Sequence, residues 1–426
     1  MTLRQLIIQE TREHGPMPFS RYMDLCLYHP ELGYYSRQSD QFGKAGDFYT
    51  SSDVHAVFGR LLARQFDEMW RVLGSPEQIE ILELGPGRGL FAQDLLDWSE
   101  KKFPDFFRAL HYSLAERSPA LRERLQLTLD RHFKTGKVSL VAWSQLCHSD
   151  RTEESAVHNL NLSSRATQGH SLGEWPRRVE GTAVSSNQSE PSAATRAPLI
   201  IFANEFFDAL PVEILSAQGA LRIAERNDHL AETWVAPSAE ELEFLGRYSV
   251  HPEAGERIEV PLAAHHTMTE IAGLMERGFI LAIDYGYTLQ EQLAGRHHGT
   301  LASYRQHSES GNPYEAPGEQ DLTAHVNFTA LADVLAQHGM TVQPLLTQSQ
   351  FLLGIGEQTQ FADAFEECRL PQERAKVAMQ LKHLITPEGM GETFHVLLAS
   401  KGVARKQTVS LSGLNFGKRR EDSQQR

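Results

Sequence analysis

The chain has 426 residues, of which 41% are hydrophobic and 23% charged, so it can bury a core of ordinary globular composition. Its formal net charge of −14 argues against nucleic acid as the main partner, because binding to phosphates requires a basic surface. No apolar run reaches the ~20 residues that span a bilayer, and the first residues lack the apolar core of a signal peptide. We therefore expect a protein without membrane insertion, located in the cytoplasm.

The predicted elements begin with an N-terminal helical region over residues 1–75. A helix is expected over 3–14, where Gly15-Pro16 ends it, and the apolar spacing of 54–72 predicts another. The segment 43–52 between them is rich in glycine and small residues. We expect this segment to act as a lid that closes over a bound ligand.

Short apolar segments alternate with helical patterns from residue 76 onward. Helices are predicted over 90–103 and 119–133. The predicted strands are 79–84, 112–116, 138–143, 198–203 and 279–284. This alternation predicts an α/β fold, with a mostly parallel sheet covered by helices on both faces. The Rossmann-like domain is expected to comprise residues 76–148 and 198–402.

Three segments interrupt or follow this pattern. Residues 149–197 are rich in Ser, Thr, Asn, Gln and Gly and show no apolar period, so a disordered insertion is predicted. Residues 206–277 contain alternating patches such as 257–260 and are predicted to form a small inserted subdomain with β-strands. Residues 403–426 are predicted to form a polar tail, of which the partly basic segment 405–426 is expected to be disordered.

A glycine-rich turn follows the first predicted strand and opens a helix: residues 83–89 read E-L-G-P-G-R-G. The glycines let the backbone turn tightly and approach a ligand, and the helix start offers free N–H groups. Dinucleotide enzymes use GxGxxG at this place, whereas this spacing resembles motif I of class I methyltransferases. The resemblance implies that Gly85, Gly87 and Gly89 pack along S-adenosyl-L-methionine and that Glu83 holds its ammonium end, directly or through water.

A second acidic residue supports this interpretation. Glu116 ends the second predicted strand, where a carboxylate can accept hydrogen bonds from both ribose hydroxyls. Because NAD enzymes use the same device, only the spacing of the glycines favours the methyl donor. At the end of the third strand, 142–144 offers a backbone N–H and the ring of Trp143 for adenine, although a core tryptophan explains this residue equally well.

A polar and aromatic motif follows the fourth predicted strand, where residues 204–211 read N-E-F-F-D-A-L-P. The carboxyl end of a strand faces the ligand crevice in this fold. The carboxylates of Glu205 and Asp208 suit a planar cation such as guanidinium, and we group Asn204 with them as a catalytic candidate. The alternative is that Asn204 and Asp208 only cap the following turn.

Two later motifs supply weaker candidates. Asp284 or Tyr285, after the fifth predicted strand, would lie at the same edge, although an aspartate that caps a turn is an equal alternative. His325 is a candidate base, but a lone histidine is more often structural. No Cys or His spacing indicates a metal site, and none is expected.

The order of these motifs resembles the MidA family of S-adenosyl-L-methionine-dependent methyltransferases. The matching segments are 28–35, 46–51, 83–89, 204–211, 284–287 and 318–328, and the resemblance runs from about residue 15 to 401 apart from the insertion. It implies a seven-stranded class I methyltransferase sheet. From the family's mitochondrial member, a complex I assembly factor, it also implies symmetric dimethylation of an arginine in a 49-kDa-type complex I subunit. A homodimer is compatible with this picture.

Three functions stay open at this point. The chain could be a protein arginine methyltransferase, a small-molecule methyltransferase, or a non-enzymatic assembly chaperone that retains a donor site. The glycine turn, Glu83 and Glu116 are intact, and this favours the two enzymatic functions.

Overall fold

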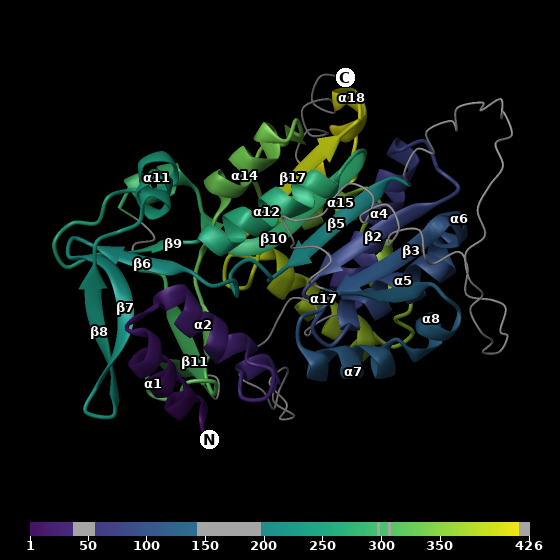
Figure 1. Cartoon of the computed structure of the whole chain (residues 1–426). Helices are drawn as coiled ribbons and strands as arrows, with labels where there is room; N and C mark the ends of the chain where they lie inside the picture. Colours follow the sequence, from purple (N-terminus) through teal and green to yellow (C-terminus); the bar gives the residue numbers. More distant parts are fainter. Residues whose placement is uncertain (37–55, 143–196, 296–298, 306–307, 417–426) are drawn as a thin grey trace, which may run out of the picture.

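A computed structural model describes residues 1–36, 56–142, 197–295, 299–305 and 308–416 (Figure 1). The predicted lid at 43–52, the adenine contact at Trp143 and nearly all of the predicted insertion at 149–197 lie outside these ranges. So does the end of the predicted tail, 417–426.

A mixed β-sheet forms the centre of the molecule, with the strand order β15-β17-β10-β5-β2-β3-β4. Its parallel strands are β2 (Ile79–Leu84), β3 (Leu110–Ala115), β4 (Val138–Val141), β5 (Leu199–Asn204) and β10 (Gly278–Tyr287). Antiparallel pairing joins β17 (Phe394–Lys401) to β10, β15 (Thr341–Val342) and β16 (Leu346–Thr347). The two-residue strand β14 (Val326–Asn327) also pairs with β10.

The predicted α/β fold is confirmed, but the sheet differs in detail from the one expected. Within the described residues it has nine strands rather than seven, and β17 makes it mixed. Strands of two residues, such as β14 and β16, are too short to show an apolar alternation, so the sequence does not reveal them.

Successive residues of the strands point to opposite faces of the sheet and enter two separate cores. Ile81 and Phe202 belong to one core, and Leu82 and Ile201 to the other. The first face is covered by α4 (Ala56–Val72), α5 (Leu90–Lys102), α6 (Pro104–Ala109), α15 (Gln348–Glu357), α16 (Ala362–Phe365) and α17 (Pro371–Ile385). The second face is covered by α12 (Leu262–Leu274) and α14 (Phe328–Gln337).

One predicted helix is divided in two. Instead of a single helix over 119–133, α7 (Pro119–Thr128) and α8 (Asp130–Lys134) meet at Leu129. Leu125 and Leu129 are both fully buried, so the apolar pattern continues across the break and hides it in the sequence.

The region 1–75 is not one unit, contrary to the prediction. The helices α1 (Leu3–His14) and α2 (Phe19–Tyr28) share a core with a second, antiparallel sheet, whereas α4 packs on the main sheet. The reason is that β1 (Met17–Pro18) pairs with β7, more than 200 residues away. The other strands of this small sheet are β6 (Glu213–Ser216), β7 (Gly219–Arg226), β8 (His229–Val235) and β9 (Arg257–Val260).

The segment 206–277, predicted to be an inserted subdomain, contains the strands β6 to β9 and the helix α11 (Ala239–Tyr248). Its predicted end lies too far along the chain, because Met268 and Ile271 of α12 are buried in the core of the main sheet. A third sheet pairs β11 (Ala302–Arg305) with β12 (Ser308–Ser310) and β13 (Asp321–Thr323), and β13 packs against α2. Short elements elsewhere are η1 (Tyr34–Ser36) and α13 (Leu289–Leu293).

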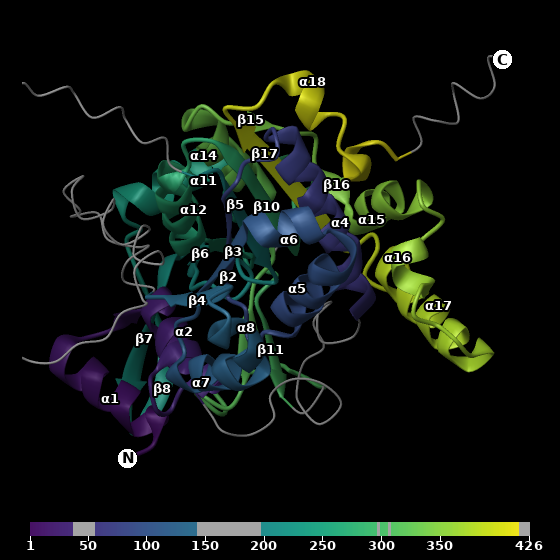
Figure 2. The same ribbon diagram turned by 90° about the vertical axis from the view of Figure 1, so that its right-hand side faces the viewer.

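The prediction of a disordered tail is wrong for residues 405–416. This segment forms α18 (Arg405–Thr408) and η3 (Ser412–Leu414), at the top and right of Figure 2. Leu411 is buried, and the N–H of Gly413 donates to Oε1 of Gln65 at 2.9 Å. Backbone N–H groups supply much of this anchoring, so side-chain polarity did not predict it.

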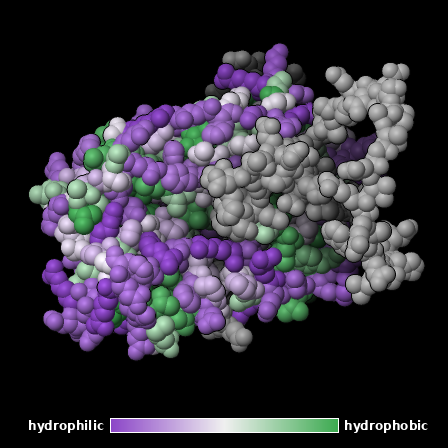
Figure 3. All heavy atoms as spheres, in the orientation of Figure 1, coloured by the Kyte–Doolittle hydropathy of each residue, from purple (hydrophilic) through white to green (hydrophobic). Residues whose placement is uncertain are grey.

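Polar side chains dominate the coloured part of the surface in Figure 3, and apolar residues appear there in small separate groups. In the parts of the chain that the structure describes, no helix has the length and apolar character needed to cross a membrane.

Candidate active site

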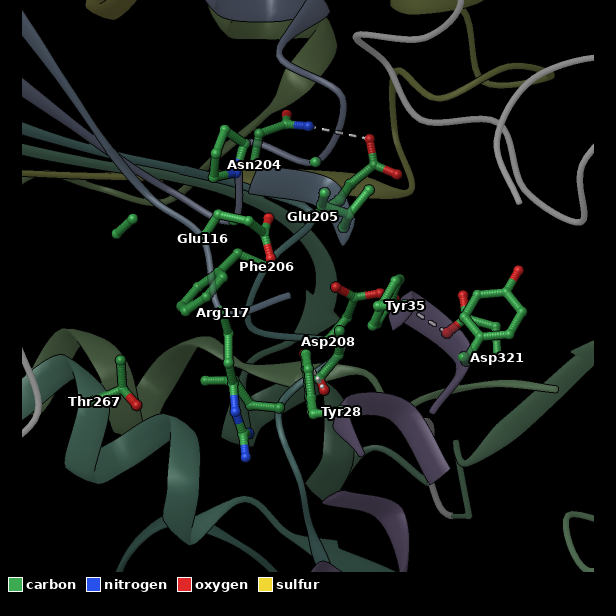
Figure 4. A pocket seen from close by; sticks show the side chains of 18 of the residues that line it. Tyr28, Tyr35, Glu116, Arg117, Asn204, Glu205, Phe206, Asp208, Thr267 and Asp321 are labelled. Atoms are coloured by element: carbon green, nitrogen blue, oxygen red, sulfur yellow. Dashed lines mark hydrogen bonds between the residues drawn. The ribbon is translucent and has the colours of Figure 1, made fainter. Parts of the chain in front are cut away.

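A cavity of about 270 Å³ opens at the carboxyl ends of β2, β3 and β5 (Figure 4). Its walls come from the turn after β2, the residues after β3 and the 204–211 motif after β5. The helices α2 and α12, the turn η1 and the strand β13 complete it. This is the place where parallel α/β sheets bind ligands.

The glycine turn contributes Gly85 and Gly87 to the lining, both at positive φ (62° and 55°). A Cβ on Gly85 would approach Cδ2 of Phe206 to 2.9 Å, whereas a Cβ on Gly87 would meet nothing within 4 Å. Gly89 does not line the cavity; a Cβ there would come within 2.6 Å of Cδ2 of Leu125. Gly89 therefore serves the packing of α5 against α7, and Gly87 leaves room for a ligand.

Glu116 is buried and lines the same cavity. Its carboxylate accepts hydrogen bonds from the backbone N–H groups of Ser118, at 2.8 Å, and of Gly87. Burial raises the pKa of Glu116 to about 7. The structure thus brings together Gly85, Gly87 and Glu116, three of the five residues predicted to bind the cofactor.

Glu83 does not line the cavity. Strand alternation turns its side chain into the core on the first face, where the hydroxyl of Tyr112 donates to Oε2 at 3.0 Å. Burial raises the pKa of Glu83 to about 8. Glu83 is therefore not placed for a direct contact with the ammonium group of the cofactor. The contact through water, which was the other expectation, is the one compatible with this position.

The turn after β5 places the three catalytic candidates, Asn204, Glu205 and Asp208, in the cavity wall (Figure 4). Glu205 adopts a positive φ of 48°, an uncommon conformation for a residue with a side chain, and accepts a hydrogen bond from Nδ2 of Asn204 at 3.2 Å. Such strain is typical of functional sites, where the surrounding structure holds it in place.

Asp284 supplies the support for this turn. Its Oδ2 accepts the backbone N–H groups of Phe206 at 3.1 Å and Phe207 at 3.0 Å, and its Oδ1 accepts that of Tyr285 at 3.0 Å. Burial raises the pKa of Asp284 well above its usual range. Asp284 thus holds the backbone behind the cavity and does not line it, contrary to one prediction.

Asp208 is 3% exposed and presents one oxygen atom without a donor. Its Oδ2 accepts the hydroxyl of Tyr285, whereas its Oδ1 is buried and has no hydrogen-bond partner among the described residues. The Oδ1 of Asn204 is in the same state. Because buried acceptors are normally hydrogen-bonded, these two atoms point to a ligand that carries N–H or O–H donors.

Tyr285 and His325 stand behind the wall rather than in it. The imidazole of His325 packs edge-on against the ring of Tyr285, with centroids 5.4 Å apart, so it is not placed to act as a base on a ligand in the cavity.

Tyr28, Tyr35 and Asp321 are among the lining residues that the sequence analysis did not identify. The Tyr35 hydroxyl donates to Oδ1 of Asp321 at 3.1 Å, and the Tyr28 hydroxyl donates to the carbonyl of Ala209 at 3.0 Å. All three lie in motifs that carried the family resemblance, 28–35 and 318–328. Membership in these motifs is the feature of the sequence that could have identified them as site residues.

The lining is acidic. Among the described residues it contains two guanidinium groups, on Arg88 and Arg117, and five carboxyl groups, on Asp24, Glu116, Glu205, Asp208 and Asp321. This excess of carboxyl groups favours a cationic ligand.

Comparison with known proteins agrees with this geometry. Residues 61–346 match the model of a family described as S-adenosyl-L-methionine-dependent methyltransferases. The chain is 27% identical over 404 residues to the mitochondrial protein arginine methyltransferase NDUFAF7 homolog of Drosophila melanogaster, covering 91% of this chain and 82% of that protein. It is 26% identical over 403 residues to the protein arginine methyltransferase NDUFAF7 of Homo sapiens, with coverages of 91% and 81%.

A solved structure shows the same fold. The crystal structure of a Burkholderia thailandensis protein bound to S-adenosyl-homocysteine superposes with a TM-score of 0.68 at 25% identity, covering 94% of this chain and 92% of that one. The names of the two curated relatives place them in mitochondria, so the expected cytoplasmic location gains no support from them.

The residues present fit S-adenosyl-L-methionine as the cofactor. A Cβ at Gly87 would project into open space, and Glu116 presents a buried carboxylate beside it, as a ribose-binding strand end requires. Asn204 and Asp208, each with a buried side-chain oxygen that lacks a partner among the described residues, line the same cavity. With the match over residues 61–346, this confirms the expected resemblance: the chain belongs to this family of S-adenosyl-L-methionine-dependent methyltransferases.

Proposed function

We propose that this methyltransferase acts on a nitrogen atom of an arginine side chain in a protein substrate. The observation that carries the proposal is Oδ1 of Asp208, buried without a donor in a cavity that holds five carboxyl groups. A guanidinium supplies N–H donors and a positive charge in the planar form that carboxylates bind best. The names of the curated relatives support the same acceptor class.

The cofactor side of the cavity is assigned to Gly85, Gly87 and Glu116. S-adenosyl-L-methionine supplies an electrophilic methyl group on a sulfonium. Glu116 accepts hydrogen bonds from the ribose hydroxyls, while the turn at Gly85 and Gly87 lets the backbone come close. Gly89 keeps α5 in register with this turn through its contact with α7. Glu83 supports the site from the core.

The acceptor side is assigned to Asn204, Glu205 and Asp208. An arginine side chain stays protonated in water, because its pKa is above ~12. Glu205 and Asp208 orient the guanidinium and stabilise the charge on its non-attacking nitrogens, and Asn204 Oδ1 accepts an N–H of the attacking nitrogen. As the attacking nitrogen would bond to the methyl carbon, the bond from that carbon to the sulfonium sulfur would break, with its electron pair left on sulfur and S-adenosyl-homocysteine as the leaving group. The methylated group then loses one N–H proton, and Asp208 is the carboxyl group that we assign to accept it, because burial raises the pKa of Asp208.

The acceptor protein is assigned from family resemblance. The mitochondrial member implies a homologue of the 49-kDa-type complex I subunit and symmetric dimethylation of one arginine. A protein of that kind is therefore the first substrate to assay, and mass spectrometry of the product reads both the residue and the number of methyl groups. Homodimers of the enzyme and a cytoplasmic location are further parts of this proposal.

The test is transfer of labelled methyl from S-adenosyl-L-methionine to that subunit and to a cell lysate. We expect label on arginine, and Asp208→Asn should lower transfer on the order of 100-fold, as the loss of one group that stabilises charge does elsewhere. Donor affinity, measured by calorimetry, should stay within about twofold because Asp208 lies on the acceptor side.

Asp105→Asn is the matched control. Asp105 lies outside the cavity lining, in an exposed pair with Arg108 at 3.0 Å, so transfer should change little. Label that appears only in small molecules would overturn the arginine assignment in favour of a small-molecule acceptor. Absence of any transfer, with donor binding intact, would favour the assembly chaperone.

A further inference from the structure

A part of the cavity wall next to the 204–211 motif is built by residues that the proposed function does not use. Asp321 at the start of β13 is 3% exposed and lines the cavity. Its Oδ1 accepts the hydroxyl of Tyr35 at 3.1 Å (Figure 4). Burial of a carboxyl group is costly unless partners compensate it, and the Tyr35 hydroxyl is one partner of Asp321.

Two tyrosine rings stand beside this carboxyl group. Tyr28 and Tyr35 pack with ring centroids 5.4 Å apart. The Tyr28 hydroxyl is tied to the carbonyl of Ala209, and the carbonyl of Tyr35 accepts the hydroxyl of Ser118 at 2.7 Å. The tyrosine pair is thereby fastened both to the acceptor turn and to the cofactor side, which fixes the position of Asp321.

Both carboxyl groups act on the same two rings. After burial, the negative charges of Asp321 and Asp208 raise the pKa of Tyr35, and both also raise the pKa of Tyr28. The hydroxyls therefore stay protonated and can donate. The rings also accept a guanidinium plane, since Cζ of Arg117 lies 4.6 Å from the centroid of the Tyr28 ring.

We infer that Asp321, held by Tyr35, is a third carboxylate of the acceptor site, beside Glu205 and Asp208, and determines the preference of the site for a guanidinium over an ammonium group. A guanidinium presents N–H donors along several edges of a plane, so Asp208 and Asp321 can each bind a different edge. A lysine ammonium is a compact point charge and cannot bridge two such groups in the same way. Oδ1 of Asp208 has no hydrogen-bond partner among the described residues, and Asp321 lines the same cavity.

This inference rests on the proposed function, and a binding experiment separates the two. The protein is loaded with S-adenosyl-homocysteine and titrated with a short peptide that contains one arginine, and with its twin that contains lysine. Wild type should bind the arginine peptide at least about tenfold more tightly, as expected for one additional charge-assisted hydrogen bond. Asp321→Asn should bring the ratio of the two affinities close to one while S-adenosyl-homocysteine affinity stays the same.

Tyr35→Phe is the second variant. It keeps the ring and removes only the hydroxyl that holds Asp321, so the arginine-to-lysine ratio should fall partway, and kinetically the KM for the arginine peptide should rise more than kcat falls. If Asp321→Asn does not fold, Tyr35→Phe decides. Asp105→Asn, in an exposed pair with Arg108 away from the cavity lining, should leave the ratio unchanged.

An unchanged ratio in a folded variant that binds S-adenosyl-homocysteine overturns the inference. Failure of the proposed function looks different: wild type would then place no methyl group on any arginine, whatever the ratio of peptide affinities.

Discussion

Single carboxyl groups carry most of the chemistry of this molecule, and burial sets their properties. Glu83 and Glu116 belong to neighbouring strand ends, but one side chain points into a core and the other into the cavity. Burial raises the pKa of both, to about 8 and about 7. At Glu83 the raised pKa makes the stability of the fold depend on pH. At Glu116 the raised pKa makes ligand binding depend on pH.

Glu83→Gln should flatten the pH dependence of stability. A folded pKa of about 8 against an ordinary 4.5 means that the folded state binds the proton more tightly, so this stabilisation is complete below pH 4.5 and is lost as the pH rises through 8. A tenfold difference in proton affinity between the folded and unfolded states corresponds to about 1.4 kcal/mol. Urea unfolding at pH 5 and pH 8 should show a larger loss for wild type than for the variant.

The control for this experiment is Glu123→Gln, which changes an exposed carboxyl group on α7. It should follow wild type at both pH values. If Glu83→Gln keeps the wild-type slope, then Glu83 is not the protonated group that we describe.

Glu116→Gln should weaken the binding of S-adenosyl-L-methionine by about tenfold, because an ionised acceptor of the ribose hydroxyls is replaced by a neutral amide. In wild type the affinity should increase as the pH rises through about 7, since ionised Glu116 is the better acceptor. The variant should lack this component. Titration calorimetry at pH 6, 7 and 8 measures the affinity of both proteins for the ligand. The ionisation of the ligand affects both proteins equally, so the difference between their pH profiles gives the contribution of Glu116. Parallel pH profiles would contradict the assignment.

Elements position these groups through contacts that cross the sheet edge. The turn after β5 carries three catalytic candidates, and a residue of the neighbouring strand β10 holds its backbone. Gly278 at the start of β10 shows how closely the two strands approach, since a Cβ there would lie 1.8 Å from the carbonyl oxygen of Leu199. The position of the turn after β5 therefore depends on the pairing of β5 with β10.

Asp284→Asn should disturb the turn after β5. Both carboxyl oxygens of Asp284 accept backbone N–H groups, and an amide can accept on one side only. Leaving a buried N–H unpaired costs about 1–3 kcal/mol, so the midpoint of urea unfolding should fall and methyl transfer should decrease more than donor binding. Asp105→Asn, at an exposed surface pair, serves as the control. A variant with unchanged stability and unchanged methyl transfer would show that the turn after β5 does not depend on Asp284.

Across the whole molecule, the two ends of the described chain close different units. The N-terminal helices complete the small sheet and reach the cavity through Tyr28 and Tyr35. The C-terminal segment packs on α4 and α15 on the far side of the main sheet, where Leu411 joins the large core (Figure 2). Each end of the described chain packs against elements that are distant from it in the sequence. Both ends therefore contribute to the stability of the fold.

Truncation after Thr408 should destabilise the protein by about 2–5 kcal/mol, through the loss of Leu411 from the core and of partners for buried polar groups. Gln65, fully buried on α4, would lose the N–H of Gly413, and Glu68 would lose that of Ser412, now at 2.8 Å. Truncation after Phe416 is the control and should leave the unfolding midpoint unchanged. Equal midpoints for the two truncations would contradict the described anchoring.

Local spacing was sufficient for the α/β class, the main parallel strands and the glycine turn that lines the cavity. An apolar strand, a turn with glycines at 85, 87 and 89, and a helix follow one another directly in the chain, and their geometry is encoded there. The 204–211 motif, which we propose as the acceptor side, was recognised as a cavity motif for the same reason.

Long-range packing decided the rest. Asp284 faces the turn after β5 from a neighbouring strand, Asp321 and Tyr35 meet across almost 290 residues, and β1 pairs with β7. Residues 405–416 are polar in sequence but anchored by backbone N–H groups. A hydrogen bond between distant segments leaves no periodicity in either one, because each side chain is chosen for a neighbour that only folding brings near.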